Sequence, residues 1–83
     1  MDNLSLIRVT DVDYVGNYTL DLKFSNGDKK RIYFIPLLKS KKQEELKDKN
    51  KFIQFGLNHW TLEWANGVDF APEYLYQQGK TIN

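Results

Sequence analysis

The sequence predicts an α+β fold, in which a small antiparallel sheet of about five or six strands carries one or two short helices. Two Asn-Gly hairpin signals, at 26–27 and 66–67, separate segments of alternating apolar and polar residues. Pro72 follows the last of these segments, and proline is favoured in the first turn of a helix. With 83 residues, the chain is expected to form a single domain over 1–83.

The first Asn-Gly hairpin is the clearest element. Apolar residues occupy every second position from 18 to 24, and residues 29–35 run back. A three-residue loop at 25–27, ending in a left-handed glycine, places Leu20 opposite Ile32. Because a shift of one residue would turn the apolar side chains to the other face, burial favours this register.

The same loop geometry at residues 65–67 pairs Trp64 with Val68 and places Glu63 opposite Asp69. The last third of the chain is therefore expected to be a strand, a tight turn, a second strand and the helix that begins at Pro72.

The remaining strands carry weaker signals. Residues 4–12 alternate loosely and are expected to form the first strand, followed by a turn over 13–17. Pro36 is expected to end the third strand, since proline cannot donate to a ladder. Residues 52–57 are expected to form a further strand. The polar tail, 77–83, is expected to be frayed.

The charged tract Lys39–Lys51 is expected to contain a short helix. Ser40 can cap its start, with Gln43 at the spacing of a capping box. Its apolar face is thin, because Leu46 is the one apolar residue between Leu38 and Phe52.

The composition excludes several function classes. The chain has no cysteine, which excludes thiol catalysis and thiolate metal sites. It lacks the basic start and apolar run of a signal peptide and any apolar stretch of the ~20 residues that cross a bilayer. We expect a cytoplasmic protein without membrane contact. The net charge of +1 gives no overall attraction to nucleic acid.

No catalytic or cofactor-binding motif is present. His59, the one histidine, lies in an expected turn, and the glycines match no phosphate-binding loop. We therefore expect no enzyme activity, no cofactor and no metal. The facing pair Glu63 and Asp69 could hold a cation or a small ligand, and the alternative is a solvent-exposed pair.

The lysine-rich tract suggests a second partner class. Residues 39–51 contain six lysines and three acidic residues, a local charge of +3 that could attract phosphate weakly. Arginine, the usual reader of bases, occurs only at positions 8 and 31. A solvated helix face with ion pairs is the simpler interpretation.

Three segments together resemble one known family. They are Tyr18-x-Leu-x-Leu-x-Phe24-x-Asn-Gly27, Pro36-Leu-Leu38 and Trp64-x-Asn-Gly67-x-Asp69-x-x-Pro72-Glu73-x-Leu75-Tyr76. The chain is similar to domain-of-unknown-function family 2442 over almost its whole length. Many members have an aspartate three residues before the proline, where this chain has Tyr33, which weakens a carboxylate site at Asp69.

The resemblance implies a small bacterial α+β domain without an established enzymatic activity. Some relatives carry a helix-turn-helix extension, for which this sequence has no room, and some are encoded beside small toxin-like proteins. These features suggest an antitoxin-like or regulatory protein.

We therefore expect a protein–protein interaction module that acts as a monomer or homodimer and uses a sheet edge or an aromatic cluster. For Trp64 and Tyr76, core packing is the simpler interpretation. Nucleic-acid binding through Lys39–Lys51 is the alternative. The candidate contact residues are Trp60, Trp64, Asp69, Glu73, Tyr74, Lys41, Lys42 and Lys47.

Overall fold

Over residues 6–82, the protein is an α+β domain with six strands, as the sequence predicts, but the strands form two sheets instead of one. The computed structural model describes residues 6–82. Its antiparallel four-stranded sheet has the order β1-β2-β3-β6, and β4 and β5 form a second antiparallel sheet. The strands are β1 (Val9–Gly16), β2 (Thr19–Phe24), β3 (Lys29–Tyr33), β4 (Phe55–Leu57), β5 (Leu62–Trp64) and β6 (Lys80–Thr81).

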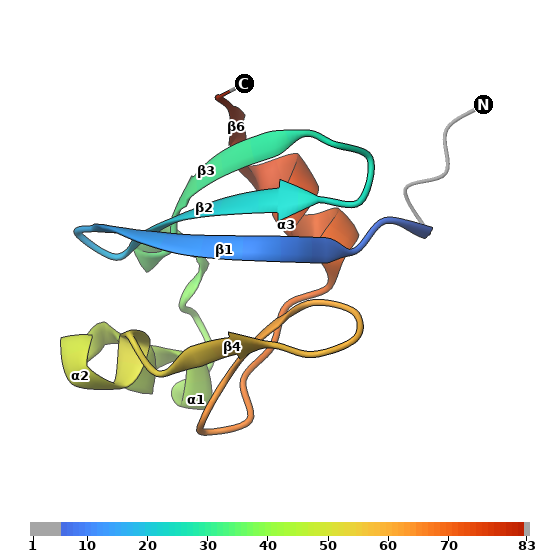
Figure 1. Ribbon diagram of the computed structural model, residues 1–83. Coiled ribbons are helices and arrows are strands. Elements are labelled where there is room, and N and C mark those ends of the chain that lie inside the picture. The colour runs from blue at the N-terminus through green and yellow to red at the C-terminus, as the bar shows by residue number, and fades with distance from the viewer. Residues whose placement is uncertain (1–5, 83) are drawn as a thin grey trace.

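The helical segments are short and lie on one side of the larger sheet. Figure 1 shows α3 behind that sheet, with α1, α2 and β4 below it, so that its front face stays open. The segments are η2 (Ile35–Leu37), α1 (Lys41–Glu44), η3 (Glu45–Lys47), α2 (Lys49–Phe52) and α3 (Pro72–Gln78).

Both Asn-Gly hairpins have the predicted register. Leu20 pairs with Ile32, and Gly27 lies in the left-handed region at φ 92°. In the second hairpin, the Trp64 N–H donates to the Val68 carbonyl at 2.8 Å, and Glu63 forms a bridge with Asp69. This bridge is isolated, so residues 68–70 do not form the full strand predicted there. Glycine at the end of each loop permits this geometry, because a side chain there would be strained.

The first strand differs from its predicted bounds. β1 runs to Gly16, so residues 13–16 are strand rather than turn, and positions 4 and 5 lie outside the described residues. The turn falls on Asn17 and Tyr18, with φ of 51° and 56°. A bulky residue in this region is unfavourable. Here the Tyr18 hydroxyl donates to the Lys47 carbonyl, which anchors the turn.

The charged tract contains the predicted capping box, but its helix is broken. Ser40 and Gln43 cap each other reciprocally at the start of α1. Asp48 then ends η3 and caps α2, accepting from the Asn50 N–H at 3.0 Å. α2 includes Phe52, so the strand predicted to begin there starts at Phe55 instead. Burial of Phe52 under the sheets overrides its strand propensity.

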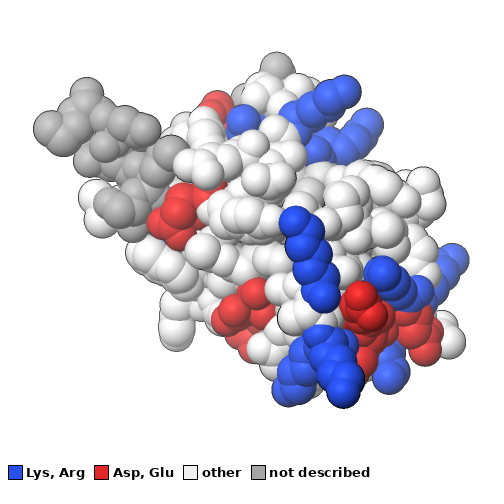
Figure 2. Space-filling model, turned by 180° about the vertical axis from the view of Figure 1, so that it is seen from behind, with Lys and Arg blue, Asp and Glu red and all other residues white. Residues whose placement is uncertain are grey.

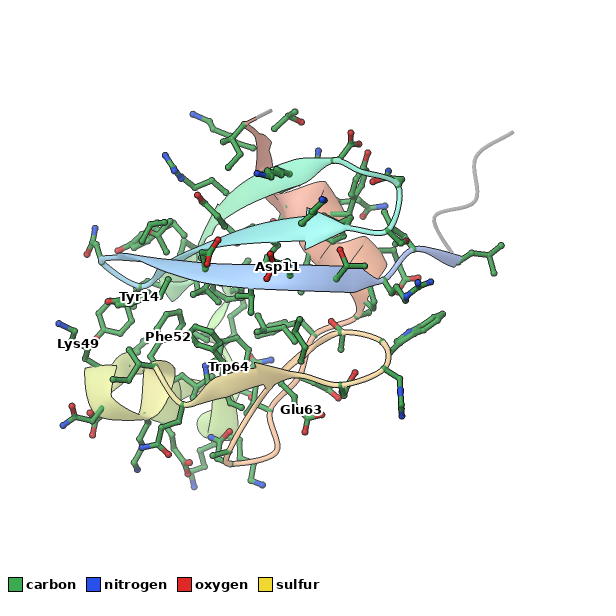
Figure 3. The ribbon with its side chains drawn as sticks, in the orientation of Figure 1. Asp11, Tyr14, Lys49, Phe52, Glu63 and Trp64 are labelled. Atoms are coloured by element: carbon green, nitrogen blue, oxygen red, sulfur yellow. The ribbon has the colours of Figure 1, made fainter. Side chains whose placement is uncertain are left out.

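The core lies between the two sheets and is rich in aromatic rings. Figure 3 shows Tyr14, Phe52 and Trp64 in the space between β1 and β4. The Trp64 ring lies 5.5 to 5.8 Å from the rings of Phe34, Phe52 and Phe70, and its Nε1–H donates to the Phe52 carbonyl at 2.7 Å. The indole therefore joins α2 to the core by both packing and a buried hydrogen bond.

The described part of the polar tail is ordered rather than frayed, since Lys80–Thr81 form β6, while residue 83 lies outside the described residues. β6 pairs with β3 through Lys30–Thr81 and Arg31–Lys80. Gly79 permits this approach, because a Cβ there would lie 2.6 Å from the Lys30 Cβ and 3.0 Å from the Ile32 Cγ1.

Trp64→Phe should lower the free energy of unfolding by about 3 kcal/mol, since it leaves a cavity and an unpaired buried carbonyl. Urea unfolding followed by circular dichroism measures this loss. The control, Trp60→Phe at an exposed indole, should change stability by less than about 0.5 kcal/mol. Equal effects of the two substitutions would contradict the central role of Trp64.

Gly79→Ala should separate β6 from β3 and destabilise the protein by about 1–3 kcal/mol, because the new methyl group overlaps the Lys30 Cβ. Amide hydrogen exchange should show faster exchange at Ile82, whose N–H donates to the Lys29 carbonyl at 3.0 Å. Gly56→Ala is the matched control, since a Cβ at Gly56 meets open space. An unchanged exchange rate of the Ile82 amide in Gly79→Ala would show that Gly79 does not pack tightly against Lys30.

Candidate interaction surfaces

A fixed loop exposes Trp60 at the end of the second sheet. The Asn58 Oδ1 accepts from the N–H groups of Trp60 and Thr61, both at 2.7 Å, and the Asn58 N–H donates to the Thr61 carbonyl at 2.9 Å. The Val9 N–H donates to the Trp60 carbonyl at 3.1 Å, which ties the loop to β1. The Trp60 side chain nevertheless remains exposed, at 45% of its residue surface.

The other aromatic candidates do not join Trp60 in one cluster. Trp64 is buried in the core, and Tyr74 stacks on Phe70 with 6.1 Å between ring centroids. The Tyr76 ring packs edge-on against Phe24, and its hydroxyl donates to Asp28. Trp64 and Tyr76 thus have the core roles that the simpler interpretation gave them.

Glu73 lies elsewhere, in the first turn of α3. There its negative charge faces the positive end of the helix dipole, which is a favourable position for an acidic side chain.

The carboxylates of the second hairpin are brought opposite each other, as predicted. Glu63 is already engaged, because it accepts from Asn58 Nδ2 at 2.5 Å, while Asp69 is exposed. Among residues 6–82, no group of three or more His, Cys, Asp or Glu side chains could hold a metal ion. His59 is exposed in the Trp60 loop. The pair alone therefore offers a poor cation site.

The candidate lysines lie among acidic side chains. Lys42 Nζ donates to the Asn66 carbonyl at 2.9 Å, and Lys47 lies 3.9 Å from Glu44. Lys41 is exposed in α1. Figure 2 shows blue and red side chains intermixed at the end of the molecule that carries α1 and α2. This mixture favours a solvated surface over a continuous phosphate-binding strip.

A second surface, whose residues the sequence did not single out, lies at the edge of the larger sheet beside β3. It is a shallow groove of about 420 Å³ between β3, η2 and the start of β6. Its lining residues are Thr19, Arg31, Ile32, Tyr33, Pro36, Leu37, Gln78 and Lys80. The sequence predicts Pro36 as the end of a strand and residues 77–83 as a frayed tail, and neither pattern indicates a groove.

One ion pair crosses the open face of the larger sheet. Arg31 donates to both carboxylate oxygens of Asp21, at 2.7 and 2.9 Å, from the paired position on the next strand. These hydrogen bonds and the positive charge of Arg31 lower the pKa of Asp21 below its ordinary 3.8. The pair fixes the position of the Arg31 guanidinium at the border of the groove.

Comparison with protein families places the chain in a known family. Residues 9–81, from the start of β1 to the end of β6, match the family described as "Protein of unknown function (DUF2442)". The chain belongs to this family. Searches of curated proteins and of solved structures each found no match. The DUF2442 match spans both sheets, the Trp60 loop and the groove beside β3, so all these features lie inside the family domain.

In the described part of this DUF2442 domain, no helix is long and apolar enough to span a membrane.

Substitution of Asp21 should change how the Tm of the protein depends on pH in the acidic range. Because the pKa of Asp21 is lowered in the folded state, its stabilising contribution is present above about pH 4 and is lost as the pH falls through the folded pKa. The Tm difference between the wild type and Asp21→Asn should therefore narrow between about pH 5 and pH 2. Arg31→Gln, the matched substitution, should behave in the same way. A difference that stays constant with pH would show that the pair does not contribute.

Proposed function

We propose that this protein is a non-catalytic protein–protein interaction module that contacts its partner through the Trp60 loop. The exposure of Trp60 on a hydrogen-bonded backbone is the observation that carries the proposal. Tryptophan is enriched among the residues that dominate binding energy at protein interfaces. A solvent-exposed indole in a held position is therefore a suitable anchor.

The hydrogen-bonded loop favours binding because its backbone loses little conformational freedom when the partner binds. Asn58 holds the N–H groups of Trp60 and Thr61, and Val9 holds the Trp60 carbonyl. Association then costs less conformational entropy than it would for a mobile loop. Leu57, at 40% exposure on the adjacent strand β4, adds apolar surface next to the loop.

An antitoxin-like role, in which the module masks a protein encoded nearby, is the specific form of this proposal. A masking interaction requires a surface complementary to the partner and no catalytic residue. Burial of apolar surface is the dominant favourable term in most protein–protein association. Such a complex should persist at high salt, whereas nucleic-acid binding through Lys39–Lys51 should weaken steeply as salt rises.

Trp60→Ala should abolish or strongly weaken capture of the partner. The tagged wild type, Trp60→Ala and the control Ile53→Ala, which removes an equally exposed apolar side chain from another surface, are used to capture proteins from the native lysate. We expect a partner that survives about 0.5 M salt with the wild type and Ile53→Ala, and a loss of about tenfold or more with Trp60→Ala.

The intrinsic fluorescence gives an independent readout with the purified partner. Because Trp64 is buried and Trp60 is exposed, partner binding at Trp60 should shift the emission to shorter wavelength. The shift should be absent in Trp60→Phe. Equal capture by Trp60→Ala and the wild type, or recovery of nucleic acid alone, would refute the proposal.

A further inference from the structure

The outer edge of β3 is covered over only part of its length. The Phe24 N–H donates to the Asp28 carbonyl and the Phe34 N–H to the Tyr18 carbonyl. Backbone groups alternate in direction along a strand, so Lys29, Arg31 and Tyr33 turn their N–H and C=O groups away from β2. The hydrogen bond from Ile82 to the Lys29 carbonyl confirms this direction.

β6 pairs with this edge only at Lys30 and Arg31. On the N-terminal side of Lys80, the chain turns away through Gly79 into α3 instead of continuing along β3. The last residue pair between β3 and β6 is Arg31 with Lys80, so the outward N–H and C=O groups of Tyr33 lie past the end of β6. A strand edge with free backbone groups is a template for an additional extended segment.

The groove lies directly beside these backbone groups. Ile32, Tyr33, Pro36 and Leu37 supply its apolar lining, and the Tyr33 side chain is exposed at 48% of its residue surface. An extended peptide uses main-chain hydrogen bonds for affinity and pockets beside the strand for alternate side chains. The outward backbone groups of β3 and the apolar groove beside them provide both of these features at one place in the fold.

The charge beside the groove selects the chemistry of the occupant. β3 and β6 contain the basic residues Lys29, Lys30, Arg31 and Lys80 and no acidic residue. Arg31 and Lys80 line the groove itself. Asp21 offsets Arg31 through their ion pair, and its charge also acts on Lys29, whereas Lys80 lies at the groove on β6. A segment that carries carboxylates would complement this border, and a basic segment would be repelled.

We propose that the groove binds an extended acidic segment of a partner protein, in which apolar side chains alternate with aspartate or glutamate. The segment forms backbone hydrogen bonds with Tyr33, places an apolar side chain against Pro36 and Leu37, and directs a carboxylate to Lys80. This inference goes beyond the proposed function, because it concerns a second surface and does not depend on Trp60.

The apolar lining and the strand edge favour a peptide over nucleic acid. Stacking platforms for bases combine exposed aromatic faces with a basic track along the backbone. Here one tyrosine is exposed in the groove, beside proline and aliphatic side chains. An oligonucleotide is therefore a competing occupant that the experiment must test.

The test uses an N-acetylated, C-amidated hexapeptide of alternating glutamate and valine, titrated into the ¹⁵N-labelled wild type. We expect chemical-shift changes centred on Tyr33, Leu37 and Lys80, with binding that weakens as salt is raised. The lysine–valine hexapeptide and single-stranded octathymidylate are the comparison probes, and neither should bind this surface.

Two pairs of substitutions test the backbone hydrogen bond and the charge separately. Tyr33→Pro removes the outward N–H, while Tyr33→Val removes the same ring and keeps the N–H. Affinity should be about fivefold lower for the proline variant than for the valine variant, a loss of one hydrogen bond. Lys80→Glu should weaken binding about fivefold, and Lys49→Glu, the same charge change on α2, should leave it unaltered. The amide spectrum of each variant verifies that it is folded.

Several results would overturn the inference. They are no shift at millimolar acidic hexapeptide, equal binding of the lysine–valine hexapeptide, binding of octathymidylate at this groove, or shifts confined to the Trp60 loop. Shifts at Tyr33 that depend on protein concentration without peptide would instead assign the groove to a second copy of the chain. Because Trp60 lies outside the groove lining, loss of the peptide site would leave the proposed Trp60 contact intact, and failure of Trp60 would leave this test unchanged.

Discussion

The packing of Trp64 is the interaction on which the rest of the structure depends. A domain of this size, without cysteine, buries limited surface and must obtain much of its stability from a few large side chains. Trp64 contacts rings contributed by three other segments, and its indole N–H satisfies a buried carbonyl at the end of α2. The second sheet and the broken helical segment thereby acquire fixed positions against the larger sheet, and the Trp60 loop is held between them and β1.

Local chemistry made part of this fold predictable. Gly27 and Gly67 end three-residue loops whose geometry, together with burial on one face, determines the register of both hairpins. The position of Phe52 and the pairing of the C-terminal segment depend on distant contacts, so short-range patterns assigned a strand and a frayed tail. The close approach at Gly79 is invisible in sequence, because it requires knowing that Lys30 and Ile32 lie opposite.

The candidate surfaces also differ in how far the sequence alone predicts them. Trp60 could be named from sequence as one of several aromatic residues near the C-terminus, whereas its separation from Trp64, Tyr74 and Tyr76 required the fold. The groove beside β3 joins residues from β2, β3, η2 and the region around Gly79, and no local pattern unites them. The opposed Glu63 and Asp69 followed from the hairpin register, but the bond from Asn58 to Glu63 did not.

The turn at Asn17 and Tyr18 has a consequence for the order of folding. The left-handed conformation of Tyr18 is locally unfavourable. The compensating contacts of Tyr18, with the Lys47 carbonyl and the Phe52 ring, come from a segment far along the chain. The glycine-terminated hairpins need no such distant support to close. We therefore expect β2–β3 and the second hairpin to act as early nuclei, with β1 joining in the late, cooperative step that closes the domain.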